Sequence, residues 1–88
     1  MNFVDLKLEA DQRLIEFLKA ELELGFTFVN LAGGHREEAN RQKSLEHART
    51  ALETIRRFEP RIADHAELFR IQTGANELEK LLNSKSST

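Results

Sequence analysis

The chain has 88 residues, of which 40% are hydrophobic and 32% charged, with a formal net charge of −2 and no cysteine. Without cysteine it forms no disulfide scaffold, thiol enzyme, iron–sulfur centre or zinc finger, and its slight acidity argues against a general nucleic-acid binder, which would carry a basic face. Four glycines and one proline among so many charged and apolar residues indicate a helical domain.

The sequence also bears on localisation. No apolar run approaches the roughly 20 residues of a membrane-spanning helix. The first residues, MNFVDLKLEAD, carry acids where a signal peptide has a basic stretch and an apolar core. We therefore expect a cytoplasmic protein with no membrane partner, consisting of one helical domain over residues 1–83 and a disordered tail at 84–88.

The first predicted helix covers residues 2–24. Leu14, Leu18 and Leu22 recur at four-residue steps, and the stripe continues through Gly25 and Val29. One apolar face therefore follows this helix toward the centre of the domain. The pattern leaves open whether residues 22–32 belong to the same continuous helix as residues 5–21.

Residues 22–31 fit two interpretations, because their apolar side chains alternate with polar ones as in a strand. We favour a helix, since no second strand is present to pair with this one. On a helix, Leu22 and Phe26 project one way and Leu24, Phe28 and Leu31 nearly the opposite way, so both sides need cover. A chain this short buries only about 60% of its unfolded surface. We therefore predict a self-association surface, in a homodimer or higher oligomer, formed by Leu22, Leu24, Phe26, Phe28 and Leu31.

A second helix follows the Gly33-Gly34 pair. We expect it to begin near Asn40, a favourable N-cap residue, and to end at Phe58 or Glu59, because Pro60 disfavours helix in the preceding residue. Its buried stripe is predicted to consist of Leu45, Ala48, Ala51, Leu52, Ile55 and Phe58.

The third predicted helix has a defined start, where Asp64 and Glu67 form a variant of the capping box. Its apolar residues follow with steps of three and four, at Leu68, Ile71, Ala75, Leu78 and Leu82. Gly74 lowers helix stability by about 1 kcal/mol relative to alanine. The sequence leaves open whether Gly74 breaks this helix.

The middle of the chain has a pattern of aromatic, leucine and small residues at Phe28, Leu31, Ala32, His35, Ala39, Ser44, Ala51 and Leu52. Over residues 25–58 this pattern resembles a single tetratricopeptide repeat (TPR). It departs from the family in that Ala39 replaces the turn glycine, Ala48 occupies the aromatic position of the second helix, and Pro60 comes about four residues late. The resemblance implies an antiparallel helical hairpin with small residues at its crossing, covered by the rest of the chain or by a second subunit.

Motifs for catalysis and cofactor binding do not appear. The three histidines, His35, His47 and His65, fit neither Glu-x-x-His nor His-Glu-x-x-His. Gly33-Gly34 is not followed by the Gly-Lys-Ser/Thr of a phosphate-binding loop, and the chain lacks both cysteine and Gly-x-Ser-x-Gly. We therefore expect a protein that is not an enzyme, with no catalytic, cofactor-binding or metal-binding residues.

These observations favour an all-α fold of three helices, a long first helix, a TPR-like hairpin and a C-terminal helix, with oligomerisation completing the cover. The expected function is a non-enzymatic protein–protein interaction module whose partners are further copies of itself, and another protein in addition. The alternative is a small helix-turn-helix regulator that binds nucleic acid. It would use Arg41, Lys43, Arg49, Arg56 and Arg57. Interleaved acids such as Glu46 and Glu53 make nucleic acid the less favoured partner.

Overall fold

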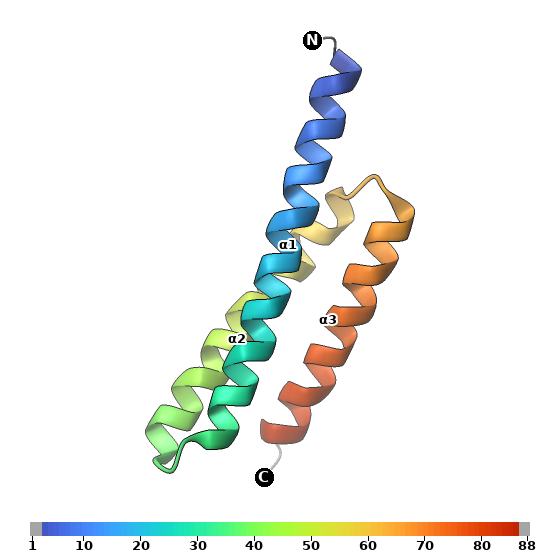
Figure 1. Ribbon diagram of the computed structural model, residues 1–88. Coiled ribbons are helices and arrows are strands. Elements are labelled where there is room, and N and C mark those ends of the chain that lie inside the picture. Colours follow the sequence, from blue (N-terminus) through green and yellow to red (C-terminus); the bar gives the residue numbers. More distant parts are fainter. Residues whose placement is uncertain (1–2, 87–88) are drawn as a thin grey trace.

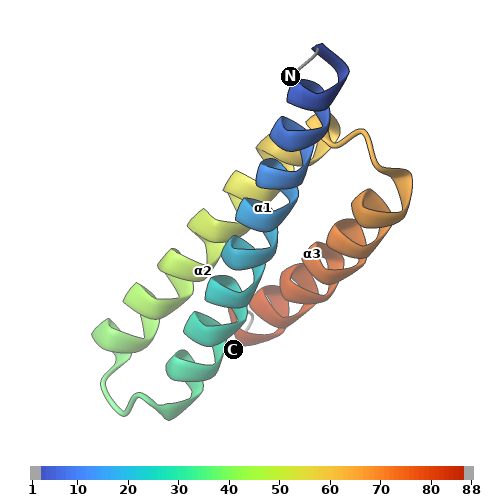
Figure 2. The same ribbon diagram turned by 45° about the horizontal axis from the view of Figure 1, so that its top comes forward.

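The computed structural model describes residues 3–86 of the chain, and the side chains of residues 8–85. This part forms three long helices, α1 (Phe3–Gly34), α2 (Glu38–Phe58) and α3 (His65–Ser86), with a short 3-10 helix, η1 (Glu59–Arg61), after α2. Helix α2 runs antiparallel to α1, and α3 runs parallel to α1 (Figures 1 and 2). The predicted all-α, three-helix fold is confirmed, and residues 3–86 contain no strand.

Helix α1 includes residues 22–31 without interruption, so the helical interpretation of this segment is correct and residues 22–32 continue the helix that precedes them. The other two helices explain why. Leu22 packs over Gly74 of α3, while the ring of Phe28 stacks on His47 of α2 with 4.9 Å between ring centroids. Helices α2 and α3 therefore cover apolar side chains on two sides of α1, which one neighbouring helix would leave exposed to water.

Helix α2 begins at Glu38, two residues before the predicted start, and the prediction of Asn40 as its N-cap is wrong. Glu37 occupies the N-cap position with extended backbone angles and no capping side-chain hydrogen bond. Glu38 instead accepts hydrogen bonds from Arg41 and Gln42, and a carboxylate in the first turn is favoured by the helix dipole. At its other end α2 stops at Phe58, within the predicted bounds. Glu59 nevertheless keeps helical backbone angles (φ −54°, ψ −35°), so Pro60 does not exclude helix in the residue before it but starts the turn η1.

Helix α3 begins as the capping pattern predicts. The backbone N–H of Glu67 donates to Asp64 Oδ1 at 3.1 Å, and that of Leu68 donates to Asp64 O at 2.9 Å. Gly74 does not break the helix, which runs on to Ser86. In the predicted disordered tail at 84–88, residues 84–86 are therefore helical, and Arg41 donates a hydrogen bond to the backbone oxygen of Lys85. Residues 87–88 lie outside the described residues.

The core forms one band along the three helices. Towards the N-terminal end of α1 it contains Ile15, Leu18, Ile55, Ile62, Ile71 and Ala75. Towards the α1–α2 turn it contains Val29, Ala32, Leu45, Ala48, Leu78 and Leu82. Leu22 and Leu52 pack against both groups and join them. The buried members of the predicted stripes of α2 and α3 lie in this band, except Ala51, which is buried outside both groups. Those stripes therefore identified most of the core.

The molecule is elongated, with extents of 54 × 19 × 16 Å. Its radius of gyration is 15.2 Å, against about 12 Å for a compact chain of this length. Helix α1 has 32 residues and α2 and α3 have 21 and 22, so the first turns of α1 extend past its neighbours (Figure 1). The chain exposes 6251 Å², whereas a compact monomer of its mass exposes about 5,300 Å².

Candidate interaction surface

The five residues of the predicted self-association surface do not lie on one face. Leu22, Phe26 and Phe28 are half-buried and pack against the core. Leu24 and Leu31 are the two that reach solvent, with 45% and 49% of their surfaces exposed. Leu22 and Leu24 therefore lie on opposite sides of the helix, as predicted. Phe28, predicted on the same side as Leu24, is partly covered by His47 of α2.

Phe17 joins Leu24 and Leu31 in an exposed apolar row that the sequence reasoning missed. Its side chain is 46% exposed, and the three residues are spaced by seven, a step that rotates an α-helix by only about 20° from one to the next. Ala20 and Thr27, both exposed, lie one turn after Phe17 and Leu24. We call the set Phe17, Ala20, Leu24, Thr27 and Leu31 the α1 stripe. The seven-residue spacing of its three large residues is the feature of the sequence that could have identified the stripe.

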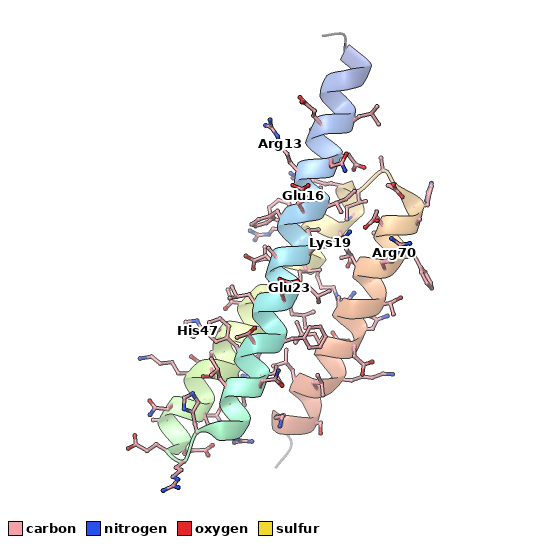
Figure 3. All side chains as sticks on the ribbon, viewed as in Figure 1. Arg13, Glu16, Lys19, Glu23, His47 and Arg70 are labelled. Carbon is pink, nitrogen blue, oxygen red and sulfur yellow. The ribbon has the colours of Figure 1, made fainter. Side chains whose placement is uncertain are left out.

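Charged side chains border the α1 stripe. Glu16 and Glu23 each precede a stripe residue by one position and therefore lie about 100° round the helix from it. Both are exposed and lie one above the other on α1, whereas His47 lies on the other side of that helix, over α2 (Figure 3). One flank of the stripe is therefore acidic, and the other is formed by α2.

Helix α2 contributes a row of exposed or half-buried residues at three- and four-residue steps from His47. This row consists of Lys43, His47, Thr50, Thr54 and Arg57. Its contact with Phe28 places His47 beside the stripe. One shallow hollow on the same helix is lined by Thr50, Glu53, Thr54 and Arg57. The row carries two bases, Lys43 and Arg57. Glu53 borders it on α2, and Glu21 lies on the same side of α1, so this flank of the stripe carries charges of both signs.

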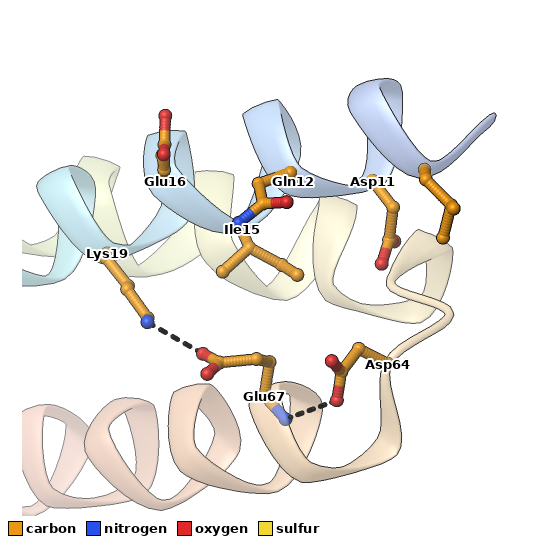
Figure 4. Close-up of a pocket in the computed structure, with 8 residues that line it drawn as sticks. Asp11, Gln12, Ile15, Glu16, Lys19, Asp64 and Glu67 are labelled. Carbon is orange, nitrogen blue, oxygen red and sulfur yellow. Dashed lines mark hydrogen bonds and ion pairs between the residues drawn. The ribbon is translucent and has the colours of Figure 1, made fainter. Parts of the chain in front are cut away.

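A second hollow, of about 250 Å³, lies between α1 and α3 and contains several carboxylates (Figure 4). Lys19 Nζ lies 2.7 Å from Glu67 Oε2, and Asp64 caps α3. Asp11 Oδ1 accepts a hydrogen bond from the backbone N–H of Ala63 at 2.8 Å. Glu67 and Asp11 therefore hold α1 against the start of α3 and the segment before it, whereas Asp64 acts within α3. Within residues 8–85, histidine and acidic side chains form no group of three or more arranged as a metal site.

His35 and Ser44 bring together the residue types of a base and a hydroxyl nucleophile. A hydrogen bond of 3.0 Å joins His35 Nε2 to Ser44 Oγ. Ser44 is only 7% exposed, on the face of α2 that packs on α1. The pair therefore fastens the α1–α2 turn to the second helix, at a position where a substrate has little access to the hydroxyl.

The basic residues considered for nucleic-acid binding are spread over different sides of α2. Arg56 pairs with Glu59 and Glu79 and donates to Asn76 of α3 at 2.7 Å. Arg41 pairs with Glu38 and with the backbone of α3. Lys43 and Arg57 lie in the row beside the α1 stripe. The structure therefore does not gather these residues on one basic face.

Comparison with known proteins adds no relative to this description. The chain matches no protein-family model, no curated protein and no solved structure. None of the helices in the described part of the chain has the length and apolar character needed to cross a bilayer.

Proposed function

We propose that this protein is a small, non-enzymatic helical interaction module, TPR-like in its α1–α2 hairpin, that acts as a homo-oligomer. The observation that carries the proposal is the α1 stripe, in which three large apolar side chains lie in line in water. Single exposed apolar residues are ordinary, but a continuous row with polar borders is typical of a protein–protein contact.

The exposed area supports the same proposal. The excess over a compact monomer of this mass is on the order of 1,000 Å², close to the roughly 800 Å² that each partner buries in an interface of standard size. The elongated form and the free outer side of α1 account for this excess. A partner that lies along α1 would bury an area close to this excess.

The TPR-like hairpin is supported by the small residues at its helix crossing. Ala32, Ser44, Ala48 and Ala51 are buried between α1 and α2, and small side chains let two helices approach closely. A single repeat does not bury its own faces, since repeats of this kind depend on stacking neighbours. Helix α3 covers one side of this hairpin, and a second copy of the chain would cover the other.

The proposal is tested by reversing the character of one stripe residue. We expect Leu24→Glu to weaken self-association by roughly 100-fold or more, because each partner would place an unpaired charge in the contact. Light scattering coupled to size-exclusion chromatography measures the mass, and circular dichroism checks that the helices remain.

Phe69→Glu is the matched control, because Phe69 is 69% exposed on α3 and lies outside the stripe. Its variant should keep the oligomeric mass. If the unaltered chain is oligomeric and Leu24→Glu keeps the same mass, self-association does not run through the stripe. The nucleic-acid alternative makes a separate prediction, a duplex mobility shift at low salt that charge reversal at Arg57 abolishes.

A further inference from the structure

The α1 stripe is a narrow apolar surface whose one polar member needs no outside partner. The Thr27 hydroxyl donates to the backbone oxygen of Glu23 at 2.9 Å, so a partner that covers Thr27 leaves no hydroxyl unpaired. From Phe17 to Leu31 the stripe runs along the helix for about 21 Å. A straight apolar strip on the outside of one helix fits the apolar face of another helix.

Carboxylates without an ion pair border this stripe. Glu16 and Glu23 are exposed on one flank, and Glu21 is half-buried on the other. Lys19 is within one turn of both Glu16 and Glu23. Its ammonium instead lies 2.7 Å from Glu67 Oε2 of α3, and Glu16 points away from it (Figure 4). None of the ion pairs within residues 8–85 includes Glu16, Glu21 or Glu23, so the stripe has an acidic border on α1.

The other charges near the stripe do not offset this border. Arg13 lies on the line of the stripe one turn before Phe17, where it ends the apolar run. On the α2 flank, the bases Lys43 and Arg57 are accompanied by Glu53. That flank therefore sets little preference for the charge of a partner, whereas the flank of Glu16 and Glu23 favours a cation.

The carboxylates limit how tightly the stripe binds a second copy of the chain. In a parallel pair each flank meets the opposite flank, which places Glu16 of one copy against Glu21 of the other. In an antiparallel pair that overlays the whole stripe, the two-fold axis passes at Leu24 and brings the two Glu23 side chains within one turn of each other. Like charges destabilise both contacts. Apolar burial still favours association, so we expect self-association to be weak rather than absent.

A helix with basic residues beside its apolar face avoids this repulsion. Its lysine or arginine side chains would meet Glu16 and Glu23, which have no other partner for their charge. Charges that border the apolar seam between two helices select one partner over another. The same carboxylates repel phosphate groups, so neither nucleic acid nor an anionic lipid surface fits this face.

From these observations we propose that the preferred occupant of the α1 stripe is an amphipathic helix of another protein, with lysine or arginine along the border of its apolar face, and that this helix displaces the second copy. The inference rests on the proposed function, since it names a further partner for the same surface. Charge complementarity with Glu16 and Glu23 distinguishes this helix from a second copy.

Two synthetic peptides test the proposal against the full chain. Both consist of three heptads with leucine at the a and d positions, and the e and g positions are lysine in one peptide and glutamate in the other. Either orientation then presents these charges to Glu16 and Glu23. Fluorescence anisotropy should show the lysine peptide binding roughly tenfold more tightly or better, with a difference that shrinks as salt is added. Equal affinities, or tighter binding of the glutamate peptide, would overturn the proposal.

Charge-reversed variants show whether the peptide binds at this border. Glu16→Lys combined with Glu23→Lys should weaken binding of the lysine peptide about tenfold. The matched control is Glu46→Lys combined with Glu77→Lys, which changes the net charge equally at exposed acids outside the stripe. If both double variants lose the same affinity, the peptide responds only to net charge and the proposal is wrong.

A neutral substitution tests the apolar part of the contact. Leu24→Gln removes a stripe side chain without changing the charge and should weaken the lysine peptide about tenfold or more. Phe69→Gln on α3 is the control and should bind as the unaltered chain does. Undiminished binding by Leu24→Gln would place the peptide elsewhere and overturn the assignment to the stripe.

Mass measurements separate this proposal from the proposed function. Where the unaltered chain is dimeric, saturating lysine peptide should convert it into a complex of one chain and one peptide. A dimer that persists with the peptide bound would overturn the displacement. A mass of 10.1 kDa without peptide would remove the proposed self-association, whereas the inference about the basic helix stands or falls with the peptide comparison.

Discussion

Two glycines set the distance between α1 and α3. Leu78 of α3 lies over Gly25 of α1, and Leu22 of α1 lies over Gly74 of α3, so each helix inserts a leucine at the glycine of the other. A methyl group at Gly25 would lie 2.6 Å from Leu78 Cδ2 and 3.6 Å from Ala51 Cβ. Leu78 is fully buried.

Gly25→Ala is therefore expected to destabilise the fold, although alanine is the better helix former by about 1 kcal/mol. Overpacking a filled core costs typically 1–3 kcal/mol, which exceeds the gain in helix propensity. Gly34→Ala is the control, because no atom lies within 4 Å of a methyl group at that position. Chemical denaturation of both variants measures the difference. An unfolding free energy for Gly25→Ala at or above that of the unaltered chain would show that the close approach is not limiting.

At this scale the sequence predicted part of the arrangement. The helical step placed Gly25 on the apolar stripe correctly, but Gly74 was interpreted only as a potential break. A glycine inside a helix has the same local signature whether it weakens the helix or admits a side chain from another one. Only the position of Leu22 in space distinguishes the two, and this position depends on how the helices are arranged.

Among the helix ends, the start of α3 depends on one side chain. Asp64 Oδ1 accepts the backbone N–H of Glu67 at 3.1 Å, satisfying one of the donors that a helix leaves unpaired.

We expect Asp64→Ala to lower the unfolding free energy by about 1 kcal/mol, the usual cost of losing such a cap. The matched variant is Glu37→Ala at the N-cap of α2, where the side chain makes no capping bond and the loss should be smaller. Urea denaturation of the two variants gives the comparison. Equal losses, or a larger one for Glu37→Ala, would contradict the capping role of Asp64.

Helix identity could be predicted from the sequence, whereas some helix ends could not. Apolar spacing identified all three helices. Asp64 marked a start correctly because a cap acts within a few residues, and the predicted end of α2 is correct although Glu59, the residue before Pro60, stays helical. The start of α2 was predicted wrongly at Asn40. The helix begins at Glu38, whose carboxylate accepts hydrogen bonds from the side chains of Arg41 and Gln42. Several residues near this start can serve as caps, so composition alone does not choose among them.

For the molecule as a whole, the sequence indicated that α1 is apolar on more than one side but not which side remains open. Leu24 and Leu31 were predicted to project away from Leu22 and Phe26, and both are exposed. Phe28, assigned with them, is partly covered by His47, and Phe17 was overlooked. Which residues α2 covers depends on the crossing of the two helices, which rests on small residues far apart in the chain. The exposed apolar face of α1 therefore begins nearer its N-terminal end than predicted, at Phe17.

The mass of the unaltered chain in solution shows whether two copies associate. Sedimentation equilibrium over a wide concentration range distinguishes a monomer of 10.1 kDa from larger species. We expect a mass twice this value at high concentration, with dissociation on dilution, because a second copy would cover the α1 stripe. A mass of 10.1 kDa at every concentration would show that the chain does not self-associate.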